Sequence, residues 1–88
     1  MINLYKNLPA IDLHGYDREY ARIMINDFIL DNYKIKNNKI IIIHGIGTGI
    51  LQKETQRILK QNKFVESYKI DNFNNGQTIA ELKKNIDK

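Results

Sequence analysis

Cysteine is absent from all 88 residues of the chain. Neither a disulfide framework nor a thiolate metal site is therefore available, and the absence fits a cytoplasmic protein. Long apolar runs are missing as well, since the longest, Ile40–Ile43, is far too short to cross a bilayer. Residues 1–10 lack the apolar stretch of a signal peptide. We expect a soluble cytoplasmic domain with no membrane partner.

Charge of one sign does not dominate the sequence. Fourteen Lys and Arg residues face ten Asp and Glu residues, which gives a net charge of +4 and a pI near 9.4. This excess favours an anionic partner such as a phosphate backbone. The lysines are scattered, however, and Lys34, Lys36 and Lys39 are the nearest approach to a cluster. Charge alone is a weak indication of the partner.

The first half of the chain alternates between strand and helix patterns. Apolar and polar residues alternate over Ala10–His14, which predicts a strand. Apolar residues at helical spacing then predict a helix from Arg18 to about Tyr33, with Asp17 as its N-cap. The isoleucine-rich segment Lys39–His44 predicts a second strand, and its lack of alternation favours a central strand buried on both faces.

The second half begins with a glycine-rich turn, Gly45–Gly49, and a second amphipathic helix ending near Asn62. Strands are predicted over Phe64–Ile70 and Thr78–Lys83, joined by a turn over Asp71–Gly76. The order β-α-β-α-β-β predicts an α/β fold, a two-layer sandwich with a mixed four-stranded sheet, parallel crossovers and a closing antiparallel hairpin. One domain is expected over residues 10–83, with an N-terminal extension over 1–9 and a frayed tail over 84–88.

The two histidines occupy equivalent positions in this scheme, because His14 and His44 each end a predicted strand. Adjacent parallel strands lie about 5 Å apart, so both imidazoles would reach the same carboxyl edge of the sheet, where ligands bind in open α/β sheets. The glycine-rich turn starts there too. Its backbone N–H groups and the following helix N-terminus are suited to binding a phosphate.

Such an edge predicts phosphodiester chemistry. Histidine can act as an acid or a base near neutral pH, and backbone N–H groups can stabilise developing charge. Asp12 shares a strand face with His14 and has three possible roles: orienting an imidazole, acting as a base, or holding Mg²⁺ or Mn²⁺ through water. The catalytic candidates are therefore Asp12, His14 and His44, and no protein ligand set for a metal is predicted.

Each feature also has a purely structural explanation. A histidine at a strand end is more often a turn residue or a partly buried polar group. The turn lacks both the dinucleotide fingerprint and the Gly-Lys-Ser/Thr of a Walker loop. Lys53 and Arg57 are candidate nucleic-acid contacts, although basic residues spaced in this way more often form a solvated helix face. Tyr16, Tyr33, Tyr68 and Phe73 show no spacing typical of RNA-stacking motifs.

Two segments together carry a family resemblance. Ile11–Gly15 resembles the Leu-Asp-Leu-His-Gly motif that opens Smr (small MutS-related) domains. His44–Gly49, followed by Leu51, resembles their second signature, His-Gly-x-Gly-x-Gly. One amphipathic helix fills the space between the two motifs, as in the family, and the resemblance runs from about residue 10 to residue 82.

The resemblance implies a two-layer fold similar to the C-terminal domain of translation initiation factor three. It also implies endonuclease or nicking activity on DNA or RNA, with Asp12 and His14 as the catalytic or substrate-contacting pair. The phosphate-binding turn would comprise His44, Gly45, Gly47, Thr48 and Gly49. Family members are often attached to a larger protein, and some act on messenger RNA at stalled ribosomes, so a larger protein or the ribosome is the implied targeting partner.

Two departures from the family pattern are present. Many members carry a basic residue where this chain has Gln52, and the glycine-rich turn before the last strand is reduced to Asn74–Thr78.

The sequence leaves three hypotheses about function: an Smr-type nuclease, a nucleic-acid-binding module that does not cut, and a protein-interaction domain that docks through its open sheet face. The choice between DNA and RNA, metal dependence and oligomeric state stay open.

Overall fold

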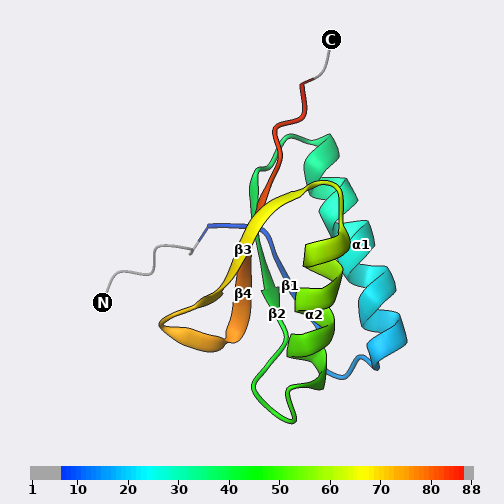
Figure 1. Ribbon diagram of the computed structural model, residues 1–88, viewed down its shortest axis with the longest axis vertical. Coiled ribbons are helices and arrows are strands. Elements are labelled where there is room, and N and C mark those ends of the chain that lie inside the picture. The colour runs from blue at the N-terminus through cyan, green and yellow to red at the C-terminus, as the bar shows by residue number, and fades with distance from the viewer. Residues whose placement is uncertain (1–6, 87–88) are drawn as a thin grey trace.

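Two helices lie side by side against one face of a four-stranded sheet (Figure 1). This arrangement is seen in a computed structural model that describes residues 7–86. The fold is the predicted two-layer α/β sandwich. In chain order its elements are β1 (Ala10–Asp12), α1 (Arg18–Lys34), β2 (Lys39–Ile43), α2 (Ile50–Gln61), β3 (Val65–Asp71) and β4 (Asn74–Leu82).

The sheet is mixed, with the strand order β1-β2-β4-β3. β1 and β2 pair in parallel, with Asp12 opposite Ile43. β4 pairs antiparallel with β2 on one side and with β3 on the other. The predicted parallel pair and closing hairpin are both confirmed. β3 runs in the same direction as β2, but β4 lies between them, so the second helical crossover skips one strand position.

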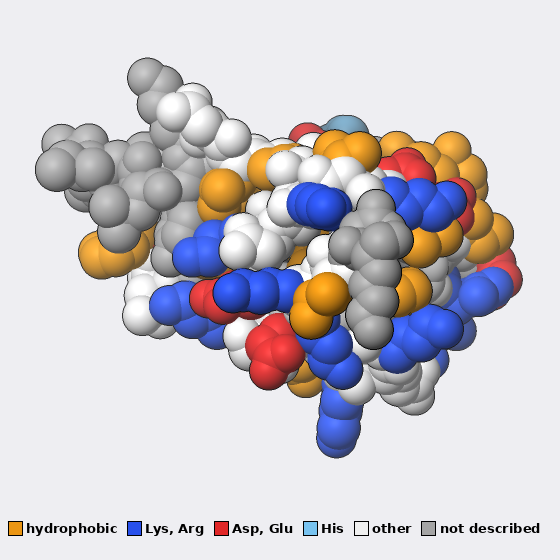
Figure 2. All heavy atoms as spheres, turned by 90° about the horizontal axis from the view of Figure 1, so that it is seen from above, with side chains coloured by type: hydrophobic (Ala, Val, Ile, Leu, Met, Phe, Trp, Pro, Cys, Tyr) orange, Lys and Arg blue, Asp and Glu red, His pale blue; other side chains and the backbone are white. Residues whose placement is uncertain are grey.

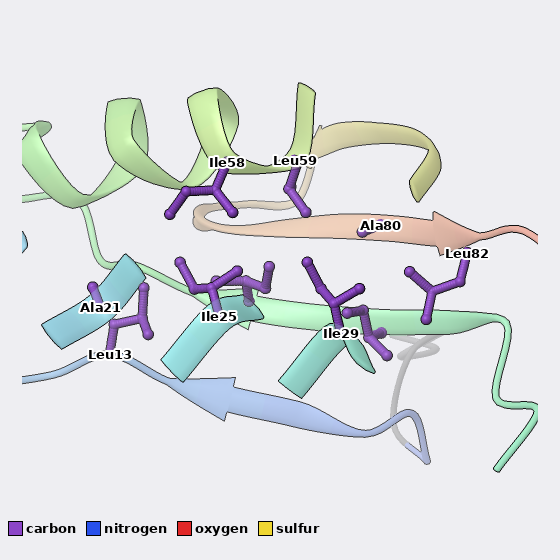
Figure 3. Packing of buried hydrophobic residues seen from close by; sticks show 10 residues of the cluster. Leu13, Ala21, Ile25, Ile29, Ile58, Leu59, Ala80 and Leu82 are labelled. Atoms are coloured by element: carbon purple, nitrogen blue, oxygen red, sulfur yellow. The ribbon is translucent and has the colours of Figure 1, made fainter. Parts of the chain in front are cut away.

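The core lies between the helices and the sheet, and Figure 3 shows side chains of both layers pointing toward one another. α1 supplies residues spaced by four, and α2 supplies an adjacent pair. Burial of each large aliphatic side chain contributes about 1.5–3 kcal/mol. The buried cluster consists of Leu13, Ala21, Ile25, Ile29, Ile40, Ile42, Ile58, Leu59, Ala80 and Leu82.

β2 has the central position that its four isoleucines predict. Ile40 and Ile42 are completely buried beneath the helices. Ile41 faces the opposite side and is only 5% exposed, although neither described helix covers that side. The strand is thus almost closed to solvent on both faces, with Ile43 half-buried at its end.

The first helix begins where the sequence predicts. Asp17 is extended, and its carboxylate accepts a hydrogen bond from the Tyr20 backbone N–H at 2.8 Å. Glu19 adds a negative charge to the first turn, where it favours the helix dipole. The N-terminus of α1 is therefore fixed immediately after the loop that follows β1.

Two strand boundaries differ from the prediction by more than one residue. β1 ends at Asp12 rather than at His14, because the Asp12 carboxylate accepts the His14 N–H at 2.9 Å and the chain turns there. β4 begins at Asn74 rather than at Thr78, since Asn74 already pairs with Asp71 across the hairpin. The predicted six-residue turn is therefore a turn of two residues, Asn72 and Phe73.

Residues 83–86 belong to no helix or strand. Most of the predicted N-terminal extension, residues 1–6, and the end of the predicted frayed tail, residues 87–88, lie outside the described residues. Neither helix within residues 7–86 is long and apolar enough to cross a membrane.

Candidate functional site

Three connections meet at the carboxyl edge of β1 and β2, at the lower end of Figure 1. The Leu13 N–H donates to the Ile43 carbonyl at 2.9 Å, which joins the chain after β1 to the end of β2. On the other side, the Gly76 carbonyl accepts from the N–H groups of His44 and Gly45, at 3.0 and 2.8 Å. The segment Gly45–Gly49, called the glycine loop below, is therefore attached to the sheet between β1 and the hairpin.

Asp12 and His14 lie exposed at this edge. One carboxylate oxygen of Asp12 accepts the His14 N–H, so the two side chains leave the sheet from a single local turn. His14 is exposed, and its ring forms no hydrogen bond with another residue between 7 and 86. The parallel register carries His14 past the end of β1 toward the start of the glycine loop.

His44 reaches the same edge but points inward, and only 7% of its surface is exposed. Its Nδ1 lies 2.8 Å from the Gly45 carbonyl oxygen and its Nε2 lies 2.8 Å from the Thr78 hydroxyl. Because a carbonyl only accepts, Nδ1 must carry a proton, and in the neutral ring Nε2 then accepts from Thr78. Both nitrogens are thus engaged in holding the glycine loop to β4.

The glycine loop depends on backbone conformations that other residues rarely adopt. The φ angles of Gly45, Gly47 and Gly49 are 78°, 26° and 83°, all in the left-handed region. A Cβ atom added at any of the three would meet nothing within 4 Å, so backbone conformation rather than crowding requires glycine there. The space around the loop is open, and the N-terminus of α2 follows directly.

Thr48 completes the loop that the sequence assigns to phosphate binding. It is exposed, and its hydroxyl lies 3.4 Å from the Ile50 N–H as a weak acceptor. The structure therefore brings Gly45, Gly47, Thr48 and Gly49 together in one accessible turn at a helix N-terminus.

The two candidate nucleic-acid contacts on α2 differ in their surroundings. Lys53 is exposed in the first turn, and its N–H donates to the Gly49 carbonyl at 3.0 Å. Arg57 lies one turn further on, where its guanidinium pairs with Glu54 and lies 3.3 Å from the Gln61 side-chain oxygen. The hydrogen bond from Arg57 lowers the pKa of the Glu54 carboxyl below its usual value. Arg57 is thus already engaged, whereas Lys53 is exposed in the turn of α2 that directly follows the glycine loop.

Arg57 also borders an open groove of about 430 Å³ between α1 and α2. Arg22 and Lys63 line this groove together with amide side chains and Phe64. The groove lies on the helical layer, away from the turn that holds Asp12 and His14.

Positive charge is dispersed over the molecule. Seen from the end opposite the glycine loop, Lys and Arg side chains spread over the surface with acidic side chains among them (Figure 2). Several basic residues are paired: Arg22 with Glu19, Arg57 with Glu54, and Lys39 with Glu81 at 3.8 Å. No group of three or more His, Asp and Glu side chains within residues 7–86 is placed to hold a metal ion.

Residues that the sequence-based prediction did not select also shape the edge. Thr78 anchors the His44 ring, and Gly76 accepts the two N–H groups that open the glycine loop. Thr78 could have been recognised, because it shares a two-residue period with the buried Ala80 and Leu82 and is the polar member of that set. The contact at Gly76 depends on strand order and has no local signal.

Comparison with known proteins was made by sequence and by structure. The family model described as the Smr domain matches residues 11–83. The chain is 35% identical over 85 residues to Endonuclease MutS2 of Clostridium acetobutylicum, covering 93% of this chain and 11% of that protein. It is 37% identical over 76 residues to Endonuclease MutS2 of Clostridium botulinum (strain Eklund 17B), covering 83% and 10%. The chain thus spans about a tenth of the length of these relatives.

Solved structures share the fold. The Smr domain of Thermus thermophilus MutS2 superposes with a TM-score of 0.83 at 23% identity, covering 86% of this chain and 99% of that one. YdaL, a stand-alone small MutS-related protein from Escherichia coli, gives a TM-score of 0.81 at 23% identity, covering 85% and 64%. The match over residues 11–83 confirms the resemblance seen in the two motifs. The chain belongs to the Smr domain family.

Proposed function

We propose that this Smr domain binds DNA or RNA at the carboxyl edge of its sheet and cleaves or nicks a phosphodiester there. The observation that carries the proposal is the exposed Asp12–His14 turn beside a glycine loop with three left-handed glycines. The name Endonuclease MutS2, borne by relatives that are 35% and 37% identical, supports it.

The glycine loop would hold a phosphate of the substrate. The Gly45 N–H is already donated to the Gly76 carbonyl, but an anion can approach the later N–H groups of the loop because Gly47 and Gly49 carry no side chain. The α2 N-terminus adds about half a positive charge. Lys53, exposed in the first turn of α2, would contact an adjacent phosphate. The loop therefore supplies binding and charge stabilisation, not proton transfer.

Proton transfer would fall to Asp12 and His14. Hydrolysis requires a base that takes a proton from the attacking water and an acid that gives one to the leaving oxygen. The solvent-exposed His14 imidazole suits either task near neutral pH. Asp12 keeps one carboxylate oxygen outside its bond to the His14 N–H, and that oxygen can take a proton or orient the imidazole.

Asp12 could also hold a divalent ion. Mg²⁺ is commonly bound through one or two carboxylates together with substrate phosphate oxygens. The described residues form no group of three or more His, Asp and Glu side chains placed to hold a metal ion, so substrate phosphate oxygens would have to complete the coordination of Mg²⁺ or Mn²⁺ at Asp12. Its contribution would be stabilisation of charge on the phosphate.

His44 would act as a positioning residue. Its ring nitrogens are held by the Gly45 carbonyl and the Thr78 hydroxyl, and its surface is almost wholly covered. We therefore assign the chemical step to Asp12 and His14, and the shape of the phosphate-binding loop to His44. Since the chain spans about a tenth of the length of its curated relatives, we further propose that a larger protein directs this domain to its nucleic-acid substrate.

A cleavage assay tests the proposal. Purified protein is incubated with labelled single-stranded RNA and with supercoiled plasmid, in magnesium, manganese or EDTA. We expect Asp12→Asn and His14→Ala each to lower the cleavage rate by at least about a hundredfold, the usual scale of general acid–base catalysis. Both side chains are exposed, so circular dichroism should show unchanged folding.

Asp31→Asn, an exposed carboxylate near the end of α1, is the matched control and should cut normally. Cleavage that persists in EDTA favours acid–base chemistry without a metal. Wild-type protein that binds nucleic acid but cuts no substrate contradicts the catalytic assignment and leaves a binding module. Absence of both binding and cutting favours the protein-interaction hypothesis instead.

A further inference from the structure

Phe73 is the most exposed large hydrophobic residue in the described part of the chain. It occupies the two-residue turn at the tip of the β3–β4 hairpin, and 84% of its surface is accessible to solvent. A single exposed apolar side chain is ordinary in itself. Two features distinguish this ring: its turn is held rigidly, and that turn lies near the proposed phosphate site.

The turn that carries Phe73 is held in place by a buried carboxylate. Asp71 is 6% exposed; one of its oxygens accepts the Phe73 N–H at 2.9 Å and the other accepts the Gln77 side-chain amide at 2.8 Å. The Asn74 side chain accepts the Gly76 N–H at 3.0 Å and braces the returning strand. The backbone is thus fixed while the aromatic ring is left in water.

The returning strand of the hairpin, β4, contacts the proposed phosphate site. Gly76 accepts the N–H of Gly45, and at about 3.3 Å per residue Phe73 lies ~10 Å along the strand from that contact. In Figure 1 the hairpin projects to the left from the lower half of the sheet, and the glycine loop projects from the lower end. A nucleic-acid strand bound by the loop could therefore extend across Phe73.

The rest of the hairpin tip suits nucleobases better than phosphates. Asn72, Asn74 and Asn75 are exposed, and residues 72–77 contain no charged side chain. Amide groups both donate and accept hydrogen bonds and can pair with base edges. A flat apolar ring with amides beside it offers one surface for stacking and another for hydrogen bonding.

We propose that Phe73 is a stacking platform for an unpaired base, so that this site takes single-stranded RNA or DNA in preference to intact duplex. The inference rests on the proposed function and specifies its substrate. In a duplex the faces of each base are covered by its neighbours, whereas a single strand leaves them free to stack on aromatic side chains. Phe73 acts in substrate binding and takes no part in proton transfer.

The chain contains no tryptophan, which makes a direct test possible. Phe73→Trp introduces a single indole, excited at the red edge of its absorption where tyrosine does not absorb. Titration with single-stranded oligonucleotide should quench its emission strongly, and the same sequence as a duplex should quench it weakly. Ile35→Trp, at a 69% exposed site beyond the far end of α1, is the control and should not respond.

Affinity provides the second measurement. Phe73→Ala should weaken binding of the single strand by about five- to a hundredfold, the range found for loss of one base–aromatic stack. Phe73→Tyr should bind as wild type, and duplex affinity should stay unchanged in both variants. Because the ring is exposed, folding is not at risk.

Failure of this inference is distinct from failure of the proposed function. If Phe73→Ala binds single strands as tightly as wild type, or if single strands do not quench the Phe73→Trp indole, the stacking platform is wrong. Cleavage that depends on Asp12 and His14 is not contradicted by either result. If duplex quenches the indole as strongly as single strand, the preference is wrong. If wild-type protein binds no nucleic acid, both proposals fall together.

Discussion

At the scale of single residues, the hydrogen bonding of His44 determines how the loop before α2 is held. Its imidazole is the only buried ring with two polar contacts among the described residues, one to the Gly45 carbonyl and one to Thr78. Thr78 is wholly buried, so solvent cannot reach the contact between its hydroxyl and the His44 ring. Loss of that hydroxyl would leave Nε2 unsatisfied in a dry environment.

Thr78→Val removes the hydroxyl while keeping the shape of the side chain. We expect it to lower the free energy of unfolding by about 1–3 kcal/mol, the cost of leaving a buried polar group unpaired. Urea denaturation measures the change. Thr55→Val is the matched control, because Thr55 is equally buried and its hydroxyl has no partner among the described residues. Equal destabilisation by the two substitutions would contradict a special role for the His44–Thr78 contact.

Sequence reasoning could place these residues but could not orient them. The strand pattern brought Asp12, His14 and His44 to one edge of the sheet, where the structure has them. It treated His14 and His44 alike, yet one is exposed and the other is buried. The difference arises from Thr78, 34 residues further along the chain, which becomes a neighbour only when β4 pairs with β2.

At the scale of elements, both the backbone conformation of the glycine loop and its proposed role in phosphate binding favour glycine. Gly49 is the N-cap of α2 and has φ 83° and ψ 0°, a conformation that costs most residues about 1–2 kcal/mol. We expect Gly49→Ala to lower the free energy of unfolding by that amount. Gly49→Asn should cost less, because asparagine tolerates the left-handed region better than alanine does.

Urea denaturation of the two Gly49 variants tests this explanation. Neither new side chain meets an atom within 4 Å at its Cβ, so crowding does not confuse the comparison. If alanine and asparagine destabilise the protein equally, conformational strain is not the reason for glycine at this position.

Element limits show where periodicity stops being informative. The helices were predicted nearly at their observed limits, since apolar spacing and the Asp17 cap mark them directly. β1 was predicted too long, because alternation continues to His14 although the Asp12 carboxylate has already turned the backbone. β4 was predicted too short, because its first residues are polar and are recruited by pairing across the hairpin.

At the scale of the whole molecule, the position of β4 was beyond local sequence patterns. The order β1-β2-β4-β3 inserts the last strand between two that run parallel to each other. That insertion brings Gly76 and Thr78 against the loop that follows β2, so the shape of the proposed site depends on the end of the chain. A module that ended before β4 would lack the contacts that hold this loop.

Charge over the whole molecule gives the last prediction, the salt dependence of nucleic-acid binding. The net charge is +4, but the glycine loop holds no Lys or Arg, and three basic residues are paired with carboxylates. Each Lys or Arg contact with a phosphate adds about 0.7 to the slope of log affinity against log salt for a single strand. Since backbone N–H groups contribute no counterion-releasing charge, we expect a shallow slope of about 2 or less.

Fluorescence anisotropy with a labelled single strand at several salt concentrations measures this slope. Lys53→Ala should reduce the slope by about one contact's worth, because Lys53 is exposed in the first turn of α2 after the loop. Arg57→Ala should leave it nearly unchanged, because its guanidinium is already engaged by Glu54 and Gln61. A slope near 6 would mean that a broad basic surface dominates binding. The groove bordered by Arg22, Arg57 and Lys63 would then replace the glycine loop as the main phosphate contact.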